Sequence, residues 1–111
     1  MNRKLCVSKK IPGFSGRLDY YLLEKRYEDI KDGISTYVFG VEIEKLSLDE
    51  FNVEYIQRKK VSDLSVLREK VLEFLYMLSE NDVMPVSLVD IAQDYVEQGF
   101  FNEPEKAKKT A

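Results

Sequence analysis

The stretch that decides the fold is residues 62–101, which read SDLSVLREKVLEFLYMLSENDVMPVSLVDIAQDYVEQGFF. Apolar residues recur here at intervals of three and four, which places them on one face of a helix with 3.6 residues per turn. The pattern is interrupted at Met84 and Pro85, so the stretch predicts two helices. Each predicted helix has one apolar stripe that packs against another layer of the protein. The first stripe is Leu64, Leu67, Val71, Phe74, Leu75 and Leu78, and the second is Leu88, Ile91, Ala92 and Tyr95.

The ends of both helices carry recognisable signals. Ser62, Asp63 and Ser65 each offer a side-chain oxygen that can cap the start of the first helix, and the sequence does not choose among them. Ser87 followed by Asp90 resembles a capping box with a shorter acid, so it predicts the start of the second helix. Each helix is predicted to stop at a residue that tolerates left-handed backbone, Asn81 for the first and Gly99 for the second.

The chain before residue 62 predicts strands. Asp32-Gly33 is a strong hairpin signal, and it is followed by alternating apolar and other residues over positions 34–44. Gly40 within this strand predicts a bulge or a close approach of another part of the chain. The four predicted strands are residues 5–11, 17–26, 34–44 and 51–60.

Four strands joined by short turns and followed by two helices predict an α+β fold. We expect a four-stranded antiparallel β-meander, in the order ββββαα, with the two C-terminal helices packed on one sheet face. That face is expected to carry Tyr37, Phe39, Val41 and Ile43, and the other face to be open or half open. Residues 1–101 are predicted to form a single domain, and residues 102–111 a flexible polar tail.

The amino-acid composition indicates the class of protein and the compartment in which it is expected. The chain has 111 residues, of which 44% are hydrophobic and one third are charged, as in a globular domain. No apolar run approaches the ~20 residues of a membrane span, and no secretory signal precedes Lys9 and Lys10. The single cysteine, Cys6, cannot form an internal disulfide. We therefore expect a cytoplasmic protein in a reducing compartment.

Charge is unevenly distributed along the chain. Residues 1–60 carry 12 Lys and Arg against 10 Asp and Glu, a net charge of +2, whereas residues 61–111 carry 5 against 10, a net charge of −5. The second predicted helix would present only Asp90, Asp94 and Glu97 to a DNA groove, which is repulsive. The basic positions lie elsewhere. Arg58, Lys59 and Lys60 either protect a strand edge or contact an anion, and with Arg3, Lys4, Lys9 and Lys10 they form the alternative hypothesis of a nucleic-acid-binding regulator.

The sequence predicts no catalytic residue, no cofactor and no metal site. It contains no histidine, and its single cysteine and its glycines match no zinc or phosphate-binding pattern. Glu42, Glu44 and Glu54 are predicted on the open sheet face, where carboxylates either perform acid–base chemistry or are solvated and pair with neighbouring cations. The cations considered are Lys25, Lys59 and Arg58. A small-ligand binder or enzyme using these carboxylates is a further alternative.

Seven tyrosines and six phenylalanines exceed what a single small core requires. Tyr21 and Leu23 are predicted on the outer side of the second strand, and Phe100 and Phe101 follow the second helix. Exposed aromatic residues mark partner-binding surfaces, so these four residues are the predicted partner site. The alternative for Phe100 and Phe101 is that they fold back onto the core. The leading hypothesis is a non-catalytic protein that acts through association with another protein or with itself.

Three segments together resemble a family of small clostridial (Firmicutes) proteins of unknown function. They are Tyr20–Glu24 in the second strand, Tyr37–Ile43 in the third, and Met84–Asp90 at the start of the second helix. The resemblance covers residues 5–98. It implies a bacterial cytoplasmic protein, and it supplies no activity and no site residues.

Overall fold

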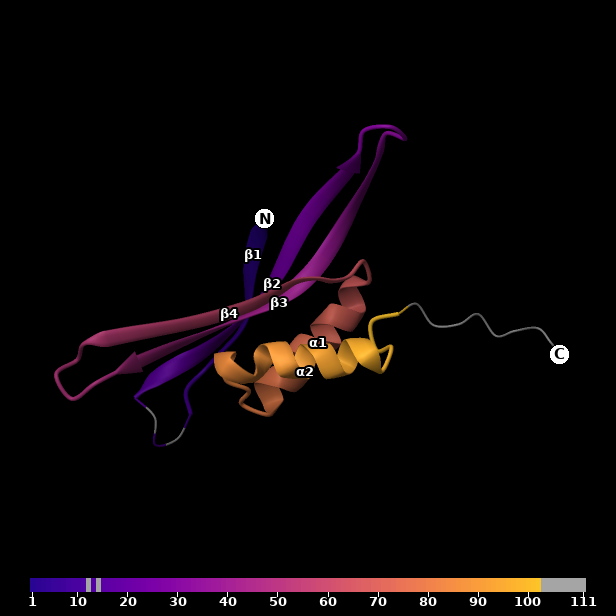
Figure 1. Cartoon of the computed structure of the whole chain (residues 1–111). Helices are drawn as coiled ribbons and strands as arrows, with labels where there is room; N and C mark the ends of the chain where they lie inside the picture. The colour runs from indigo at the N-terminus through magenta and orange to yellow at the C-terminus, as the bar shows by residue number, and fades with distance from the viewer. Residues whose placement is uncertain (12, 14, 103–111) are drawn as a thin grey trace.

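The computed structural model describes residues 1–11, 13 and 15–102. Four strands come first: β1 (Asn2–Lys9), β2 (Gly16–Asp29), β3 (Ile34–Leu48) and β4 (Glu54–Ser65). They are followed by α1 (Arg68–Glu80), the short 3₁₀ turn η1 (Pro85–Ser87) and α2 (Leu88–Glu97). The strands form one antiparallel sheet in the order β1-β2-β3-β4, and the helices lie together on one side of it (Figure 1). The predicted α+β meander with two C-terminal helices is confirmed. The predicted tail lies, apart from Asn102, outside the described residues.

The core lies between the helices and one face of the sheet, which we call the inner face. Leu18, Tyr20 and Leu22 of β2 and Phe39, Val41 and Ile43 of β3 are buried there, against α1 residues Val71, Phe74, Leu75 and Leu78 and α2 residues Leu88 and Ala92. Tyr20 is fixed further by its hydroxyl, which donates a hydrogen bond to the Val83 carbonyl at 2.9 Å. Tyr37 departs from the prediction and is exposed, because it lies beyond Phe39, the last β3 residue that pairs with β4.

The boundary between β4 and α1 differs from the prediction. Residues 62–65 were expected to begin the helix, but β4 continues to Ser65, which pairs with Phe39. Pairing with β3 therefore outweighs the local helical pattern. The residue before α1 is Leu67, whose backbone is extended. Ser65 Oγ accepts a hydrogen bond from the Leu67 N–H at 2.9 Å, so this side chain closes a turn and caps no helix.

The helix ends confirm two predictions and correct two. The predicted capping box is wrong: Ser87 has helical backbone and makes no side-chain cap, because the turn η1 leads directly into α2. Gly99 does end α2, with a φ of 76°. The N–H groups of Gly99 and Phe100 donate to the Val96 and Tyr95 carbonyls, both at 3.0 Å, which is the Schellman pattern. At the end of α1 the cap is Asn81 as predicted, but the left-handed residue is the next one, Asp82.

Two hairpins extend beyond the body of the sheet, at opposite ends (Figure 1). The first is the β2–β3 arm, residues 25–38, where β1 pairing has ended at Glu24 and β4 pairing has not begun. The second is the β3–β4 tip, residues 48–56, of which residues 48–54 lie beyond the last β2–β3 pair. Within the described part of the chain, no helix is long and apolar enough to cross a membrane.

Candidate functional site

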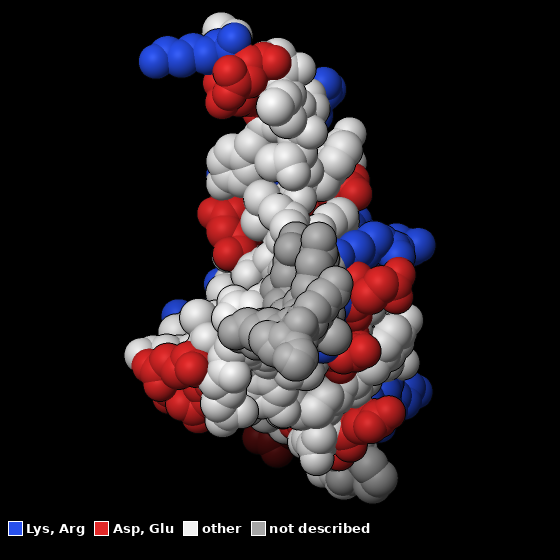
Figure 2. Space-filling model, turned by 90° about the vertical axis from the view of Figure 1, so that its right-hand side faces the viewer, with Lys and Arg blue, Asp and Glu red and all other residues white. Residues whose placement is uncertain are grey.

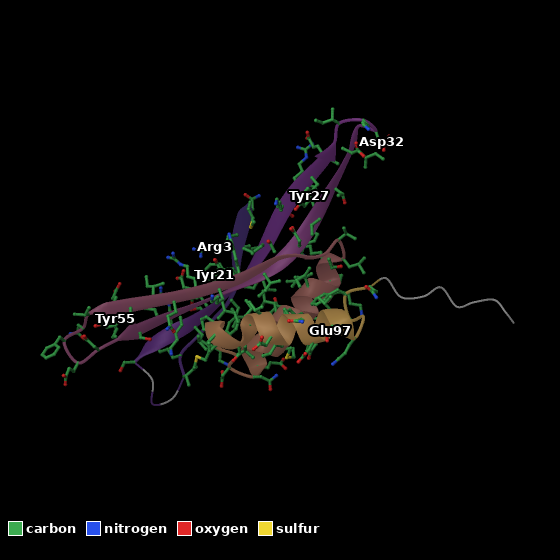
Figure 3. The ribbon with its side chains drawn as sticks, in the orientation of Figure 1. Arg3, Tyr21, Tyr27, Asp32, Tyr55 and Glu97 are labelled. Carbon is green, nitrogen blue, oxygen red and sulfur yellow. The ribbon has the colours of Figure 1, made fainter. Side chains whose placement is uncertain are left out.

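The outer face of the sheet, opposite the helices, carries a row of charged residues. Strand alternation and register bring Asp19 opposite Glu44 across β2 and β3, and Glu44 opposite Arg58 across β3 and β4. Arg3 of β1 lies across the same face, near Tyr21 (Figure 3). We call the three acids and three arginines of this face the outer-face ion network: Asp19, Glu42, Glu44, Arg3, Arg17 and Arg58.

Every carboxylate in this network is bound by an arginine. Arg3 Nη1 lies 2.7 Å from Glu42 Oε1 and 3.4 Å from Glu44 Oε2. Arg58 Nε lies 2.6 Å from the same Glu44 oxygen. On the other side of the row, Asp19 accepts hydrogen bonds from Arg17 Nε at 3.0 Å and from Ser8 Oγ at 2.5 Å. The network thus ties all four strands together on the face that lacks helices.

The burial of these carboxylates corrects a prediction. Glu42 and Glu44 were expected to be solvated, but each is only 8% exposed because arginine side chains lie over them. Of the three cations considered as partners, Arg58 pairs with Glu44. Glu54 does not join them: it begins β4, at the far end of the sheet, and it is exposed.

The ion pairs also raise the pKa values of two arginines, Arg3 and Arg17. The hydrogen bond that Arg3 donates to Glu42 raises the pKa of Arg3 above its ordinary value, and the hydrogen bond that Arg17 donates to Asp19 does the same for the pKa of Arg17. Burial is the main cause that raises the pKa of Tyr21, whose ring lies 3.9 Å from the Arg3 guanidinium carbon. The two arginines are thus held in their charged, paired state and Tyr21 in its neutral state, which suits a structural clamp.

Metal ligation has no candidate in the described residues, where no group of three or more Cys, Asp or Glu side chains could hold an ion.

The predicted cationic surface is divided. Arg58 is bound to Glu44 on the outer face, whereas the register places its neighbour Lys59 opposite Ile43, on the inner face. Lys60 returns to the outer face, opposite Glu42. Among the N-terminal cations, Arg3 is in the outer-face ion network, and Lys9 lies 2.6 Å from Asp82 and donates to the Ser79 carbonyl. The structure therefore places Arg3, Arg58 and Lys60 on the outer face, and Lys9 and Lys59 at inner-face positions.

Two of the four predicted partner-site residues are buried. Leu23 is on the outer face as expected but is only 3% exposed, because it pairs with Gly40, where the backbone of β4 crosses close to β3. Phe101 is 6% exposed, and its ring stacks edge-on against Phe74 at 5.2 Å, so it folds back onto the core. Phe100 is half-buried against Tyr95, and Tyr21 is half-buried beneath Arg3.

Exposed apolar side chains gather on the two projecting hairpins, a surface that the sequence did not predict. The β2–β3 arm exposes Tyr27, Ile30, Ile34 and Tyr37, and the β3–β4 tip exposes Leu48, Phe51, Val53, Tyr55 and Ile56. Ile30 is 95% exposed and Phe51 is 77% exposed. The length of the β pattern could have indicated these hairpins. Residues 17–48 continue this pattern past the ends of the edge strands β1 and β4, and such extensions leave one or both faces of the hairpin uncovered.

The β3–β4 tip is held rigid by one side chain, Asp49. Its Oδ1 accepts hydrogen bonds from the N–H groups of Phe51 at 2.8 Å and Val53 at 2.9 Å, and Tyr55 Oη donates to its Oδ2 at 3.3 Å. The bond from Val53 is the main cause that lowers the pKa of Asp49. Phe51 is therefore presented to solvent on a fixed turn.

Comparison with known proteins identifies a family and no activity. Residues 3–98 match the family model described as "Family of unknown function (DUF6514)", and the chain belongs to that family. No curated protein matches the chain. No solved structure matches it either.

Proposed function

We propose that this member of a family of unknown function is a non-catalytic α+β domain that works by association, with another protein or with a second copy of itself. The observation that carries the proposal is the gathering of exposed apolar side chains on the β2–β3 arm and the β3–β4 tip. Contiguous exposed apolar groups of this kind mark interaction surfaces more often than isolated ones do.

The geometry of the β3–β4 tip supports this proposal. Phe51 is an aromatic residue, a type enriched at interfaces, and the Asp49 hydrogen bonds fix its backbone before any partner arrives. A fixed turn loses little conformational entropy on binding, which favours affinity. The partner surface proposed here thus replaces the predicted one at Leu23 and Phe101, both of which are buried.

The two alternatives draw less support. A nucleic-acid-binding regulator needs free cations on one surface, yet Arg3, Arg58 and Lys9 each lie beside a carboxylate. A small-ligand binder or enzyme would use Glu42, Glu44 and Glu54, but the first two are bound by arginines and the third lies apart.

We also propose that the protein comes from a clostridial bacterium and that it is located in the cytoplasm. The resemblance of residues 5–98 supports the source, and the single free cysteine, Cys6, supports a reducing compartment.

The experiment compares affinity capture from a lysate of the source organism by the wild-type protein and by variants. Ile30→Ser and Phe51→Ser remove exposed apolar groups from the two hairpins, and Tyr76→Ser removes an exposed aromatic from α1 as a matched control. We expect proteins retained by the wild type to be lost with one or both hairpin variants and kept with the control. Equal retention by all four proteins, or a strict monomer that retains nothing, would overturn the proposal.

A further inference from the structure

The free edges of the sheet differ in charge. An edge strand presents unpaired N–H and C=O groups, and proteins commonly protect such edges with charged side chains. The edge of β1 carries Arg3, Lys4 and Lys9, the edge of β4 carries Arg58, Lys59 and Lys60, and the β2 side of the β2–β3 arm carries Lys25, Arg26, Glu28 and Asp29. The β3 side of the arm, residues 34–38, has the sequence Ile-Ser-Thr-Tyr-Val with no charge. We call this segment the uncharged edge.

The uncharged edge is accessible and well suited to strand pairing. Pairing with β4 starts only at Phe39, and residues 34–37 are exposed. Figure 2 shows the arm from the side on which β3 lies, with uncharged surface below a charged tip. β-branched and aromatic residues favour strands, and the segment contains neither proline nor glycine.

We propose that the uncharged edge pairs in antiparallel fashion with the same edge of a second copy of this chain, about a two-fold axis at Thr36. The inference rests on the proposed function and names its partner. In this register Ile34 lies opposite Val38 of the other copy, Ser35 opposite its Tyr37, and the two Thr36 residues face each other. Cross-strand pairs of this kind stabilise a sheet, and no charged residue is placed opposite another.

Two features of the arm favour a second copy over a different strand. The arm is a two-stranded ribbon from Lys25 to Val38, and a lone two-stranded ribbon is marginally stable in water. Pairing through the uncharged edge gives each copy a four-stranded sheet at this place, in a closed two-fold arrangement. By contrast, the β1 and β4 edges each carry three lysine or arginine residues, and such residues commonly protect an edge from pairing with another chain. Among the described strands, the uncharged edge is the one that lacks this protection.

The register is tested by disulfide trapping in a Cys6→Ser background, which has no other thiol. Facing Thr36 residues have Cα atoms about 4.5–5.5 Å apart, within disulfide reach. The two Ser35 residues are offset by two positions along the strands and lie about 8 Å apart, beyond that reach. We expect Thr36→Cys to form a covalent dimer under mild oxidation, and the equally exposed control Ser35→Cys to stay monomeric.

The self-association itself is tested by light scattering over a concentration series of the full chain. We expect a dimer for the wild type, and for Thr36→Lys and Thr36→Glu a dissociation constant raised at least about tenfold, because like charges then face each other. An equimolar mixture of the two variants should recover the dimer, since Lys then faces Glu. Gln57→Lys, which adds the same charge to the β4 edge, is expected to leave the dimer unchanged.

A wild-type chain that is monomeric at every concentration would overturn the inference, as would equal trapping of Thr36→Cys and Ser35→Cys, or a dimer that Thr36→Lys leaves intact. These failures are distinguishable from failure of the proposed function. If the capture experiment still shows partners lost with Ile30→Ser or Phe51→Ser, association stands and only the second copy at this edge is refuted.

Discussion

At Gly40 the lack of a side chain allows two strands to cross closely. A Cβ atom at this position would lie 2.2 Å from the Val61 carbonyl oxygen and 2.7 Å from the Ser62 Cα. Opposite Gly40, β4 inserts extra residues, and the register jumps from Val61 pairing with Val41 to Ser65 pairing with Phe39. This bulge also accounts for the burial of Leu23, the cross-strand partner of Gly40.

We predict that Gly40→Ala destabilises the protein. Alanine has the better strand propensity, but the clash is with backbone atoms that cannot rotate away, so the steric term wins and the cost is about 1–3 kcal/mol. Urea unfolding measures it, with Ser35→Ala, at an exposed position of the same strand, as the control. Equal midpoints for both variants would show that β4 moves aside without cost.

The environment of a single residue could be predicted from the sequence only where neighbouring residues in the chain determine it. Gly40 predicted a bulge or close approach correctly, because a glycine inside a strand pattern is itself the signal. The burial of Leu23 was not predictable, since it lies beside Gly40, where Val61 and Ser62 approach β3, and their shifted register leaves no mark in the sequence. Phe101 remained open between two interpretations for the same reason: the return of the chain after Gly99 is decided by its partner Phe74.

At the scale of elements, the β3–β4 tip depends on one titratable side chain, Asp49. Hydrogen bonds from Val53 and Phe51 lower the pKa of Asp49 in the folded state. A carboxylate with a lowered folded pKa stabilises the structure above its unfolded pKa, and that contribution is lost as the pH falls through the folded pKa. We therefore predict that the tip loosens only at a pH below the ordinary aspartate range.

NMR amide signals of Phe51 and Val53 measure this titration. Their midpoint should lie below that of a typical exposed aspartate, and Asp49→Asn, which keeps an acceptor oxygen but does not titrate, should abolish it. A midpoint at the ordinary value would mean that the hydrogen bonds to Asp49 do not hold in solution.

The outer-face ion network gives a second prediction for the sheet. Arg3→Ala leaves Glu42 mostly buried without its guanidinium partner and uncovers Tyr21, so we expect a loss of about 1–3 kcal/mol. Lys4→Ala, at the next position of β1, where the side chain is exposed, should change stability by less than about 0.5 kcal/mol. A double-mutant cycle of Arg3→Ala with Glu42→Gln should show coupling, and additive effects would contradict the pairing.

The sequence predicted correctly which segments form strands and which form helices, but it predicted the boundaries between them less well. Alternation at residues 34–44 and helical spacing at residues 71–78 gave the right structure, because local period and tertiary packing agree there. At residues 62–65 they disagree: the sequence is compatible with a helix start, but β3 offers pairing partners that no local pattern reveals. Alternation placed Glu42 and Glu44 on the outer face correctly, whereas their burial depends on Arg3 of β1 and Arg58 of β4.

At the scale of the molecule, the aromatic cluster at the end of α2 closes the core. Phe101 contacts the rings of Phe74 and Phe100, and its carbonyl accepts a hydrogen bond from Ser65 Oγ at 3.0 Å. We predict that Phe101→Ala costs about 3–5 kcal/mol, a large share of a typical domain's stability.

The matched control for this prediction is Phe51→Ala, which removes the same ring from the β3–β4 tip, where it is 77% exposed. It should change the free energy of unfolding by no more than about 0.5 kcal/mol. Thermal and urea unfolding of the two variants under monomeric conditions measure the contrast, and a similar loss for both would mean that the tip packs on the body in solution.

The meander order described above has a consequence for synthesis on the ribosome. Each strand pairs with the one made just before it, so the sheet is assembled in the order of translation, but its inner face waits for α1 and α2. Until the chain has been extended to Phe101, Leu18, Tyr20, Val41 and Ile43 lack their cover. We expect the nascent chain between β4 and the end of α2 to be the form that chaperones recognise, and the form most prone to aggregate.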